Sequence, residues 1–341
     1  MIIDNLSVIN LRKIKIFAES FCRNTNVITG KNGSGKTSIL EAIFFISHAK
    51  SFRKKYSQAL ISNNQKELQI KIETDRSTVK GFYNKKRKVF YKNSEIIKKT
   101  SQLSEEILIV CMSPEEIDII EEYNNEKQKY FDRIIFKIKK EHIKNIKDYK
   151  KLIVYRNTLL ENKMETDPWD NKIMELGNKI WKIRKDFFKY FIKKYKEVEK
   201  KIEIKNRYEI KYISSVLEKQ KYLIELRKKN KSNKTEVGPH KDKIKFFING
   251  SEVKEHASQG EKKIFKYFLK LTEAEILKKE KRTNPIVLID DFFAKLDGEN
   301  IMKIFSYFHC KFQTIITTTN TDNKILEKLK NKQTKIFTFN D

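Results

Sequence analysis

The chain is poor in the residues that build disulfide frameworks, tight loops and zinc sites. Its 341 residues include 3 cysteines, 4 prolines and 9 glycines. Cys22, Cys111 and Cys310 are far apart and lack the CxxC spacing typical of zinc sites and redox motifs. The 5 histidines do not cluster either. These absences exclude a disulfide-stapled fold and a structural zinc domain, and we expect buried free thiols.

Long apolar runs are missing as well. No uninterrupted apolar segment approaches the roughly 20 residues that are needed to span a bilayer. The start of the chain, from Met1 to Leu6, reads directly into a strand pattern and lacks the basic region and cleavage site of a signal peptide. We therefore predict a cytoplasmic protein without a membrane partner.

Acidic residues are outnumbered by basic ones. The chain has 74 Lys and Arg against 45 Asp and Glu, which gives a formal net charge of +29. A surface that attracts nucleic-acid phosphates is one explanation. The other is the base composition of the genome, because an AT-rich genome would favour the Lys, Ile, Asn, Phe and Tyr that are abundant here. Charge alone leaves both explanations open, whereas the 39% hydrophobic content is sufficient for a real core.

Residues that break helices are rarest in the middle of the chain. Between Pro114 and Lys234, Gly177 is the only glycine and Pro168 the only further proline. The segment reads as long charged helices, one of which starts near Pro168. Heptads are not sustained, so a long coiled coil is excluded.

Strand patterns lie on both sides of this segment. Before it, Val27 to Thr29 reads as a strand and Ser38 to His48 as a helix. After it come strands, a tight turn and a helix: Lys243–Ile248, Asn249-Gly250, Ser258–Lys281, Ile286–Ile289 and Gln313–Thr318. We predict one α/β head built from residues 1–113 and 235–341, with a mainly helical lobe, residues 114–234, inserted into it.

The first motif with a chemical meaning follows the strand that ends at Thr29. Gly30-Lys31-Asn32-Gly33-Ser34-Gly35-Lys36-Thr37 matches GxxxxGK[ST], the phosphate-binding loop. Backbone N–H groups of such a loop surround the phosphates of ATP, and the helix that starts near Ser38 places its positive end at the anion. Lys36 is expected to reach the β- and γ-phosphates, and Thr37 to ligate Mg²⁺. The alternative, an ordinary glycine-rich turn, is disfavoured by the strand–loop–helix context.

Two carboxylates end a second apolar strand. Asp290 and Asp291 follow Ile286-Val287-Leu288-Ile289, and unpaired carboxylates at the end of a buried strand are unfavourable. A bound Mg²⁺ held with the help of Asp290 explains them, with Asp291 as the catalytic group that positions the attacking water. Solvated acids at a strand end are the alternative, and the phosphate loop upstream disfavours it.

A third motif precedes the predicted helix at Ser258–Lys281. Ser258-Gln259-Gly260-Glu261 reads as a capping box, in which Ser258 caps the helix and Glu261 occupies its third position. The capped end is also an anion site, and the element is similar to the signature motif with which ABC-type ATPases bind the γ-phosphate held by the other subunit. The loop Ala294-Lys295-Leu296-Asp297 is similar to their D-loop, and Thr317-Thr318-Thr319 lies where they place a γ-phosphate switch residue, although three threonines also suit any strand.

Taken in this order, the motifs resemble those of the RecF family of bacterial DNA repair proteins, nearly end to end. Further elements carry the resemblance: Asn10-Leu11-Arg12, Ser51-Phe52-Arg53, Ser113-Pro114-Glu115, Phe131-Asp132, Arg156-Asn157-Thr158-Leu159-Leu160, Trp169-Asp170 and Gly238-Pro239-His240-Lys241-Asp242. Two departures stand out: Glu261 where the family usually has Gln, and Lys127-Gln128-Lys129-Tyr130 in place of an arginine-rich stretch. No Q-loop glutamine can be placed.

The resemblance implies a P-loop ATPase head of ABC and SMC type with a helical second lobe. It further implies an ATP-dependent homodimer on gapped or duplex DNA, weak DNA-stimulated ATP hydrolysis, and loading of a recombinase together with RecO and RecR. Three alternatives use the same loop. An SMC- or Rad50-type chromosome-maintenance head would need a very long coiled coil between Thr37 and Ser258. An ABC transporter subunit fits the helical lobe poorly, and a small-molecule kinase would have no use for the Ser258 motif.

Overall fold

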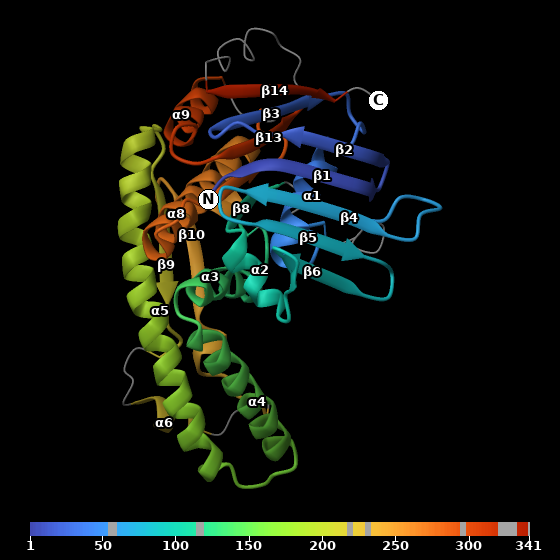
Figure 1. Cartoon of the computed structure of the whole chain (residues 1–341). Helices are drawn as coiled ribbons and strands as arrows, with labels where there is room; N and C mark the ends of the chain where they lie inside the picture. Colours follow the sequence, from blue (N-terminus) through green and yellow to red (C-terminus); the bar gives the residue numbers. More distant parts are fainter. Residues whose placement is uncertain are drawn as a thin grey trace. The chain divides into compact units, whose positions relative to one another are not determined.

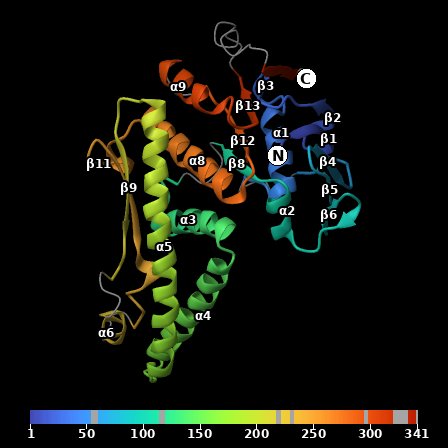
Figure 2. The same ribbon diagram turned by 60° about the vertical axis from the view of Figure 1, so that its left-hand side comes forward.

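The computed structural model describes residues 1–53, 60–113, 119–216, 221–228, 233–293, 298–319 and 333–339. The chain divides into two compact units. The first comprises Met1–Asp118, Lys201–Ile204 and Lys263–Asp341, and the second Ile119–Lys200 and Lys205–Lys262. Figures 1 and 2 show the elements of both units. Among the described residues, no helix is both long enough and apolar enough to cross a membrane.

The first unit contains a 6-stranded antiparallel sheet with the order β2-β1-β4-β5-β6-β7. Leu68, Ile70 and Ile72 of β4 are buried, whereas the residues between them are partly exposed. This alternation is typical of an antiparallel sheet with one covered face. The strands are β1 (Ile3–Leu11), β2 (Ile14–Ser20), β4 (Leu68–Thr74), β5 (Thr78–Tyr83), β6 (Lys88–Lys92) and β7 (Glu95–Ile96).

A second, 5-stranded sheet of the same unit has the order β14-β3-β13-β12-β8, and every pair in it is parallel. Strands β3, β8, β12 and β13 are buried along their whole length, as expected where both faces of a sheet are covered. The loops that follow them therefore leave from one edge of the sheet. The strands are β3 (Thr25–Gly30), β8 (Ile109–Met112), β12 (Ile286–Ile289), β13 (Thr314–Thr318) and β14 (Thr334–Phe339).

Helix α1 (Lys36–His48) contacts strands of both sheets. It is buried on nearly all sides, from Ser38 to Ser47, including the charged residue Glu41. The predicted strand before it and the predicted helix are confirmed, as are the strands before Asp290 and before Thr319. The other helices of this unit are α2 (Thr100–Glu106) and α9 (Gly298–Phe308), and α8 (Gln259–Lys281) is shared by the two units.

The second unit combines helices with a small sheet, whose strand order is β11-β10-β9. Residues of α4, α5 and α6 form one apolar core that includes Tyr149, Ile180, Trp181, Tyr222 and Leu226. The predicted helix start near Pro168 is confirmed. The elements are α3 (Asn124–Ile138), α4 (Glu141–Glu161), α5 (Asp167–Ile202), β9 (Tyr208–Ile213), α6 (Tyr222–Arg227), η3 (Pro239–Lys241), β10 (Lys243–Ile248), β11 (Ser251–Glu252) and α7 (Val253–His256).

The predicted domain boundary at residue 235 is wrong, because residues 235–262 belong to the second unit. Strand β10 pairs with β9 from Lys243↔Ile213 to Ile248↔Tyr208, and this pairing binds the segment to the lobe. The inserted unit is therefore not helical alone. The turn at Asn249-Gly250 is confirmed, since both residues have positive φ angles.

The expectation for the cysteines is only partly confirmed. None of the 3 forms a disulfide, but Cys111 alone is fully buried, while Cys22 is half-buried and Cys310 exposed.

Candidate nucleotide-binding site

The predicted phosphate loop connects β3 directly to α1. Gly35 caps the helix with φ 111°, a conformation that residues with a side chain rarely adopt. Gly30 has no room for a side chain, because a Cβ there would lie 2.5 Å from the carbonyl oxygen of Phe339 in β14. The glycines at both ends of the loop are thus required by local geometry.

The loop contains polar groups that suit an anion. Lys36 is buried, and its Nζ donates to the carbonyl oxygens of Gly30 at 2.7 Å and Lys31 at 2.5 Å, so the ammonium lies within the curve of the loop. The buried Oγ of Ser34 has no hydrogen-bond partner among the described residues. A phosphate would supply an acceptor for such groups, and the first turn of α1 adds its positive end.

Asp290, at the end of β12, collects hydroxyl groups from three other segments. Its Oδ1 accepts from Thr37 Oγ1 at 2.9 Å and from Thr317 Oγ1 at 2.6 Å. Its Oδ2 accepts from Ser113 Oγ, which follows β8, at 3.2 Å. Carboxylate and hydroxyl oxygens are the hard donors that Mg²⁺ prefers, so this cluster fits the predicted metal site.

Asp291 follows in an unusual backbone conformation, with φ 54°. Its N–H donates to Thr317 Oγ1 at 3.1 Å, and its carbonyl oxygen accepts from Lys263 Nζ at 2.8 Å. Burial raises the pKa of the nearby Tyr267 well above its ordinary value, and the charges of Asp291 and Asp290 add to this effect. The residue expected to be catalytic is thus held at a fixed turn beside the hydroxyl cluster.

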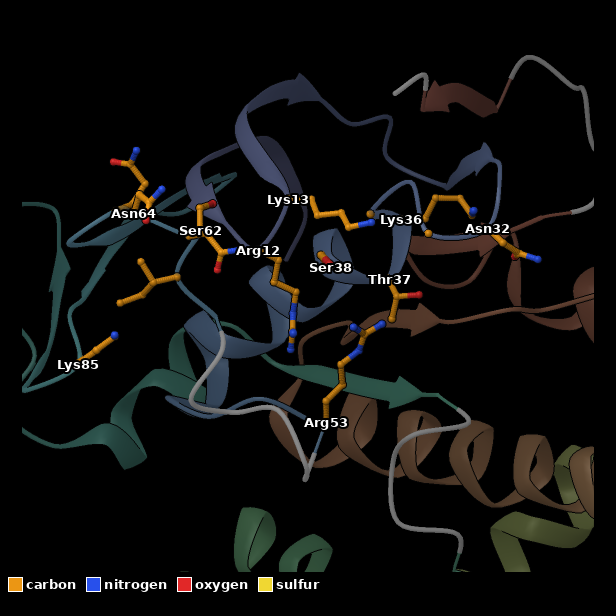
Figure 3. Close-up of a pocket in the computed structure, with 15 residues that line it drawn as sticks. Arg12, Lys13, Asn32, Lys36, Thr37, Ser38, Arg53, Ser62, Asn64 and Lys85 are labelled. Atoms are coloured by element: carbon orange, nitrogen blue, oxygen red, sulfur yellow. The ribbon is translucent and has the colours of Figure 1, made fainter.

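A pocket of about 730 Å³ opens beside the loop. Four basic side chains from three further segments line it together with Lys36, and Figure 3 shows them around the cavity: Arg12, Lys13, Arg53 and Lys85. No acidic residue is among the described residues that line it. Such an excess of positive charge favours a ligand with several negative charges, such as a nucleoside triphosphate.

Arg12 is fixed by a bidentate ion pair across the first unit. Its Nε and Nη2 donate to the two oxygens of Glu41 in α1 at 2.7 and 2.8 Å, and Ser51 Oγ donates to the same carboxylate. Because the Glu41 side chain is fully buried, the pair holds the β1–β2 turn against α1. The segments Asn10-Leu11-Arg12 and Ser51-Phe52-Arg53 therefore meet beside the phosphate loop.

The predicted signature motif lies at the start of α8, in the part of the chain assigned to the second unit. Its capping box is confirmed: the N–H of Ser258 donates to Glu261 Oε2 at 2.8 Å, and the N–H of Glu261 donates to Ser258 Oγ at 3.3 Å. Ser258 and Gln259 are exposed, and Gly260 is half-buried. Residues of a second subunit could therefore reach this helix end.

Comparisons with known proteins agree with this arrangement. The family model described as RecF/RecN/SMC N terminal domain matches residues 2–340. A protein of Thermoanaerobacter sp. (strain X514), described as DNA replication and repair protein RecF, is 33% identical over 95% of this chain and 96% of its own length. The chain belongs to the RecF family. A RecF of Lachnoclostridium phytofermentans is 30% identical, over 96% of each chain.

Solved structures extend the comparison. The structure of the recombination mediator protein RecF-ATP in the RecFOR pathway has a TM-score of 0.78 and 29% identity, with 94% of this chain and 93% of that chain covered. An SMC head bound to the C-winged helix domain of ScpA has a TM-score of 0.57 at 16% identity, over 94% and 91% of the two chains. The predicted head of ABC and SMC type is therefore confirmed as the fold of this RecF family member.

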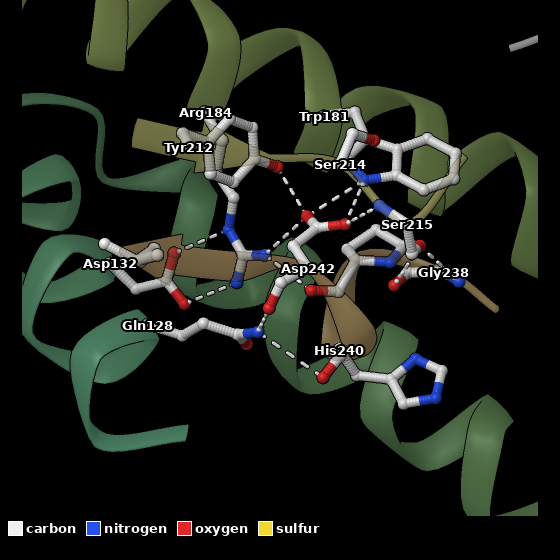
Figure 4. Close-up of polar contacts among 12 residues, drawn as sticks. Gln128, Asp132, Trp181, Arg184, Tyr212, Ser214, Ser215, Gly238, His240 and Asp242 are labelled. Carbon is white, nitrogen blue, oxygen red and sulfur yellow. Dashed lines mark hydrogen bonds and ion pairs between the residues drawn. The ribbon is translucent and has the colours of Figure 1, made fainter. Parts of the chain in front are cut away.

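The RecF-like motifs of the second unit build a buried polar cluster around Asp242. Asp242 is fully buried, and its carboxylate accepts from Trp181 Nε1, Arg184 Nη1, the hydroxyl of Tyr212 and the N–H of Ser215. Figure 4 shows these groups around the carboxylate. The Gly-Pro-His-Lys-Asp element thus ends in the residue that joins α5 to the small sheet.

Neighbouring motif residues are equally well paired. His240 contacts Tyr149 Oη at 3.0 Å and the carbonyl oxygen of Thr235 at 3.1 Å, and burial lowers its pKa. Arg156 donates to Asp170 Oδ1 at 2.7 Å and to Thr235 Oγ1 at 3.0 Å. These contacts explain the Arg-Asn-x-Leu-Leu and Trp-Asp elements as parts of the lobe's core.

Some expectations lie outside the described residues, namely the loop at Ala294, Lys295, Leu296 and Asp297, and Pro114-Glu115. Of the predicted switch residues, Thr317 is brought to Asp290 by its 2.6 Å hydrogen bond. Sequence reasoning missed Ser113 as part of the site. The signal that could have identified it is the apolar run ending at Met112, which pairs in parallel with the strand of Asp290 and so ends at the same edge.

Proposed function

We propose that the chain is an ATP-dependent DNA-binding switch that acts in recombinational repair and in the maintenance of replication forks. The observation that carries the proposal is the meeting of Thr37 and Ser113 on Asp290, within one cluster next to the loop of Lys36. Distant segments of the sequence supply these groups, and a purely structural role would leave the basic pocket beside them without a purpose.

Within one subunit, the backbone and side chains from Gly30 to Ser38 bind the phosphates of ATP. Lys36 and the end of α1 balance their charge, and Thr37 and Asp290 hold Mg²⁺. The metal, when bound, neutralises charge that develops on the phosphates. Asp291 orients the water that attacks the γ-phosphate, and Thr317 links the Asp290 cluster to the backbone of Asp291.

ATP is expected to join two copies of the chain. The exposed Ser258-Gln259-Gly260 of one copy completes the site of the other by donating hydrogen bonds to the γ-phosphate. The dimer holds duplex or gapped DNA through its phosphates, which the net charge of +29 favours. Slow hydrolysis then separates the copies. The solved relative described for the RecFOR pathway supports RecO- and RecR-like partners. We expect the switch to act in the cytoplasm.

Sedimentation with and without ATP tests the switch. We expect a monomer without nucleotide, a dimer with ATP, and a dimer that persists in Asp291→Asn because hydrolysis is blocked while binding is kept. A wild-type chain that stays monomeric under both conditions would exclude the proposal. Binding to gapped DNA should be stronger with ATP than with ADP and should weaken steeply with salt, whereas a flat salt response would argue against phosphate contacts.

A further inference from the structure

The carboxylate of Glu261 lies on the group that is proposed to meet the γ-phosphate. Its Oε2 accepts from the N–H of Ser258 at 2.8 Å and from the hydroxyl of Ser258 at 2.8 Å. A serine hydroxyl has a single proton to donate. While Ser258 donates it to Glu261, the same hydroxyl cannot donate to a phosphate.

The second oxygen of this carboxylate is also held. Asn206, which precedes β9, donates from Nδ2 to Glu261 Oε1 at 2.8 Å, and its own Oδ1 accepts from Asn249 Nδ2 at 3.1 Å. Asn249 belongs to the β10–β11 turn, so two turns of the small sheet fix the orientation of Glu261. The contact with Ser258 is therefore built into the fold of the second unit.

The negative charge of Glu261 is not balanced by a cation among the described residues. The neighbouring Lys262 pairs instead with Glu121 at 2.6 Å and donates to the carbonyl oxygen of Lys254. A carboxylate of α8 itself thus occupies the positive N-terminal end of this helix, and this contact stabilises the helix in the isolated subunit. An approaching phosphate would meet both a like charge and an engaged hydroxyl.

We propose that Glu261 is an internal competitor for the incoming γ-phosphate, which weakens ATP-dependent pairing of two copies until the Ser258–Glu261 contact is broken. The inference rests on the proposed function, in which Ser258 acts in the partner's site. A glutamine at this position would keep the capping box through its amide oxygen, remove the charge, and offer an N–H donor to the anion. The charge of Glu261 thus raises the threshold for dimerisation.

The test compares wild type, Glu261→Gln and Glu255→Gln by sedimentation equilibrium with a slowly hydrolysed ATP analogue. Glu255 lies in α7 and its side chain is exposed. Among the described residues it makes no contact with Ser258, so its replacement removes one negative charge without touching the capping box and serves as a matched control. We expect Glu261→Gln to tighten the dimer on the order of tenfold, the effect of removing one like charge near an anion at a partly exposed site. Glu255→Gln should match the wild type.

Analogue binding to the monomer, measured by fluorescence at low protein concentration, should be equal in all three proteins. A wild type that dimerises as tightly as Glu261→Gln, or more tightly, overturns the inference while leaving the ATP sandwich intact. If neither protein dimerises with the analogue, the sandwich itself is wrong and the inference falls with it. A dimer that forms only with Glu261→Gln would support both.

Discussion

The pocket beside Lys36 and the cluster around Asp242 use the same kinds of residues but balance their charges in opposite ways. Basic side chains converge on the pocket, and no acidic residue is among the described residues that line it. The carboxylate of Asp242 accepts hydrogen bonds from Trp181, Arg184 and Tyr212. Arg184 also forms an ion pair with Asp132 at 2.8 Å. Among charged side chains, only positive ones line the pocket, whereas the charges around Asp242 are paired with one another.

This difference separates a candidate binding site from a structural centre, although motifs of one family mark both. A pocket lined by positive charge and by no acidic residue gains a counter-ion when an anion enters. In a buried cluster whose charges are already paired, a ligand would have to displace the existing hydrogen bonds. Removing one partner of such a cluster leaves an uncompensated buried charge. Substitutions should therefore affect ligand binding at the first centre and folding at the second.

The largest effect is expected for Asp242→Asn. The new amide presents hydrogens to donors that need an acceptor, and it removes the negative charge that faces the buried Arg184. We expect the free energy of unfolding to fall by about 3–5 kcal/mol, as measured by urea denaturation. Asp186→Asn, which removes an exposed carboxylate of the same helix as Arg184, is the matched control and should be neutral. Equal stability of the two variants would mean that the Asp242 cluster is not structural.

Lys36→Ala should have the opposite profile. The variant removes the ammonium inside the phosphate loop, so ATP affinity should fall by at least about 100-fold, or roughly 3 kcal/mol. Titration calorimetry measures this loss, and the denaturation midpoint should hardly change, because Lys36 itself lines the pocket and its replacement leaves space for water at the loop. Lys182→Ala, at an exposed position of α5, should leave affinity unchanged. Undiminished ATP binding in Lys36→Ala would show that the pocket beside Lys36 is not the nucleotide site.

The same contrast explains what sequence reasoning could and could not predict. The phosphate loop and the Asp290 strand end were predictable because each depends on a few adjacent residues: a glycine-rich turn between strand and helix, and acids after an apolar run. The sheet of the second unit was not predictable. Strand β9 is stabilised by pairing with β10, which follows it by about 30 residues, and no local sequence pattern indicates which strands pair. The boundary error at residue 235 and the unrecognised role of Asp242 both follow from this.

The pH dependence of the free energy of unfolding should report on the cluster around Asp242, through Asp132. Burial alone would raise the pKa of Asp132, but the charge of Arg184 and the hydrogen bond from His142 outweigh it and hold the pKa at about 2. A depressed pKa stabilises the fold above the unfolded value near 4, and this stabilisation is lost as the pH falls towards 2. We expect this residue to contribute on the order of 2 kcal/mol to the loss of unfolding free energy between about pH 5 and pH 2.

Asp132→Asn provides the comparison for this titration. The variant should be less stable than the wild type at pH 7, and the gap should narrow steadily as the pH approaches 2. Chemical denaturation at several pH values measures the gap. A constant gap over the whole range would show that Asp132 does not titrate within the cluster.

Arg12 is the subtlest test of this comparison, because it both lines the pocket and forms a buried ion pair. Its guanidinium lines the open pocket and also pairs in bidentate fashion with the fully buried Glu41. Arg12→Lys keeps the charge but loses the two parallel hydrogen bonds, so we expect a loss of about 1 kcal/mol in unfolding free energy and a fewfold loss in ATP affinity. Arg87→Lys, at an exposed turn, is the control. If only affinity changed, Arg12 would act on the ligand alone, and if only stability changed, the pair with Glu41 would be purely structural. A change in both would place the residue where the pocket is joined to the folded core.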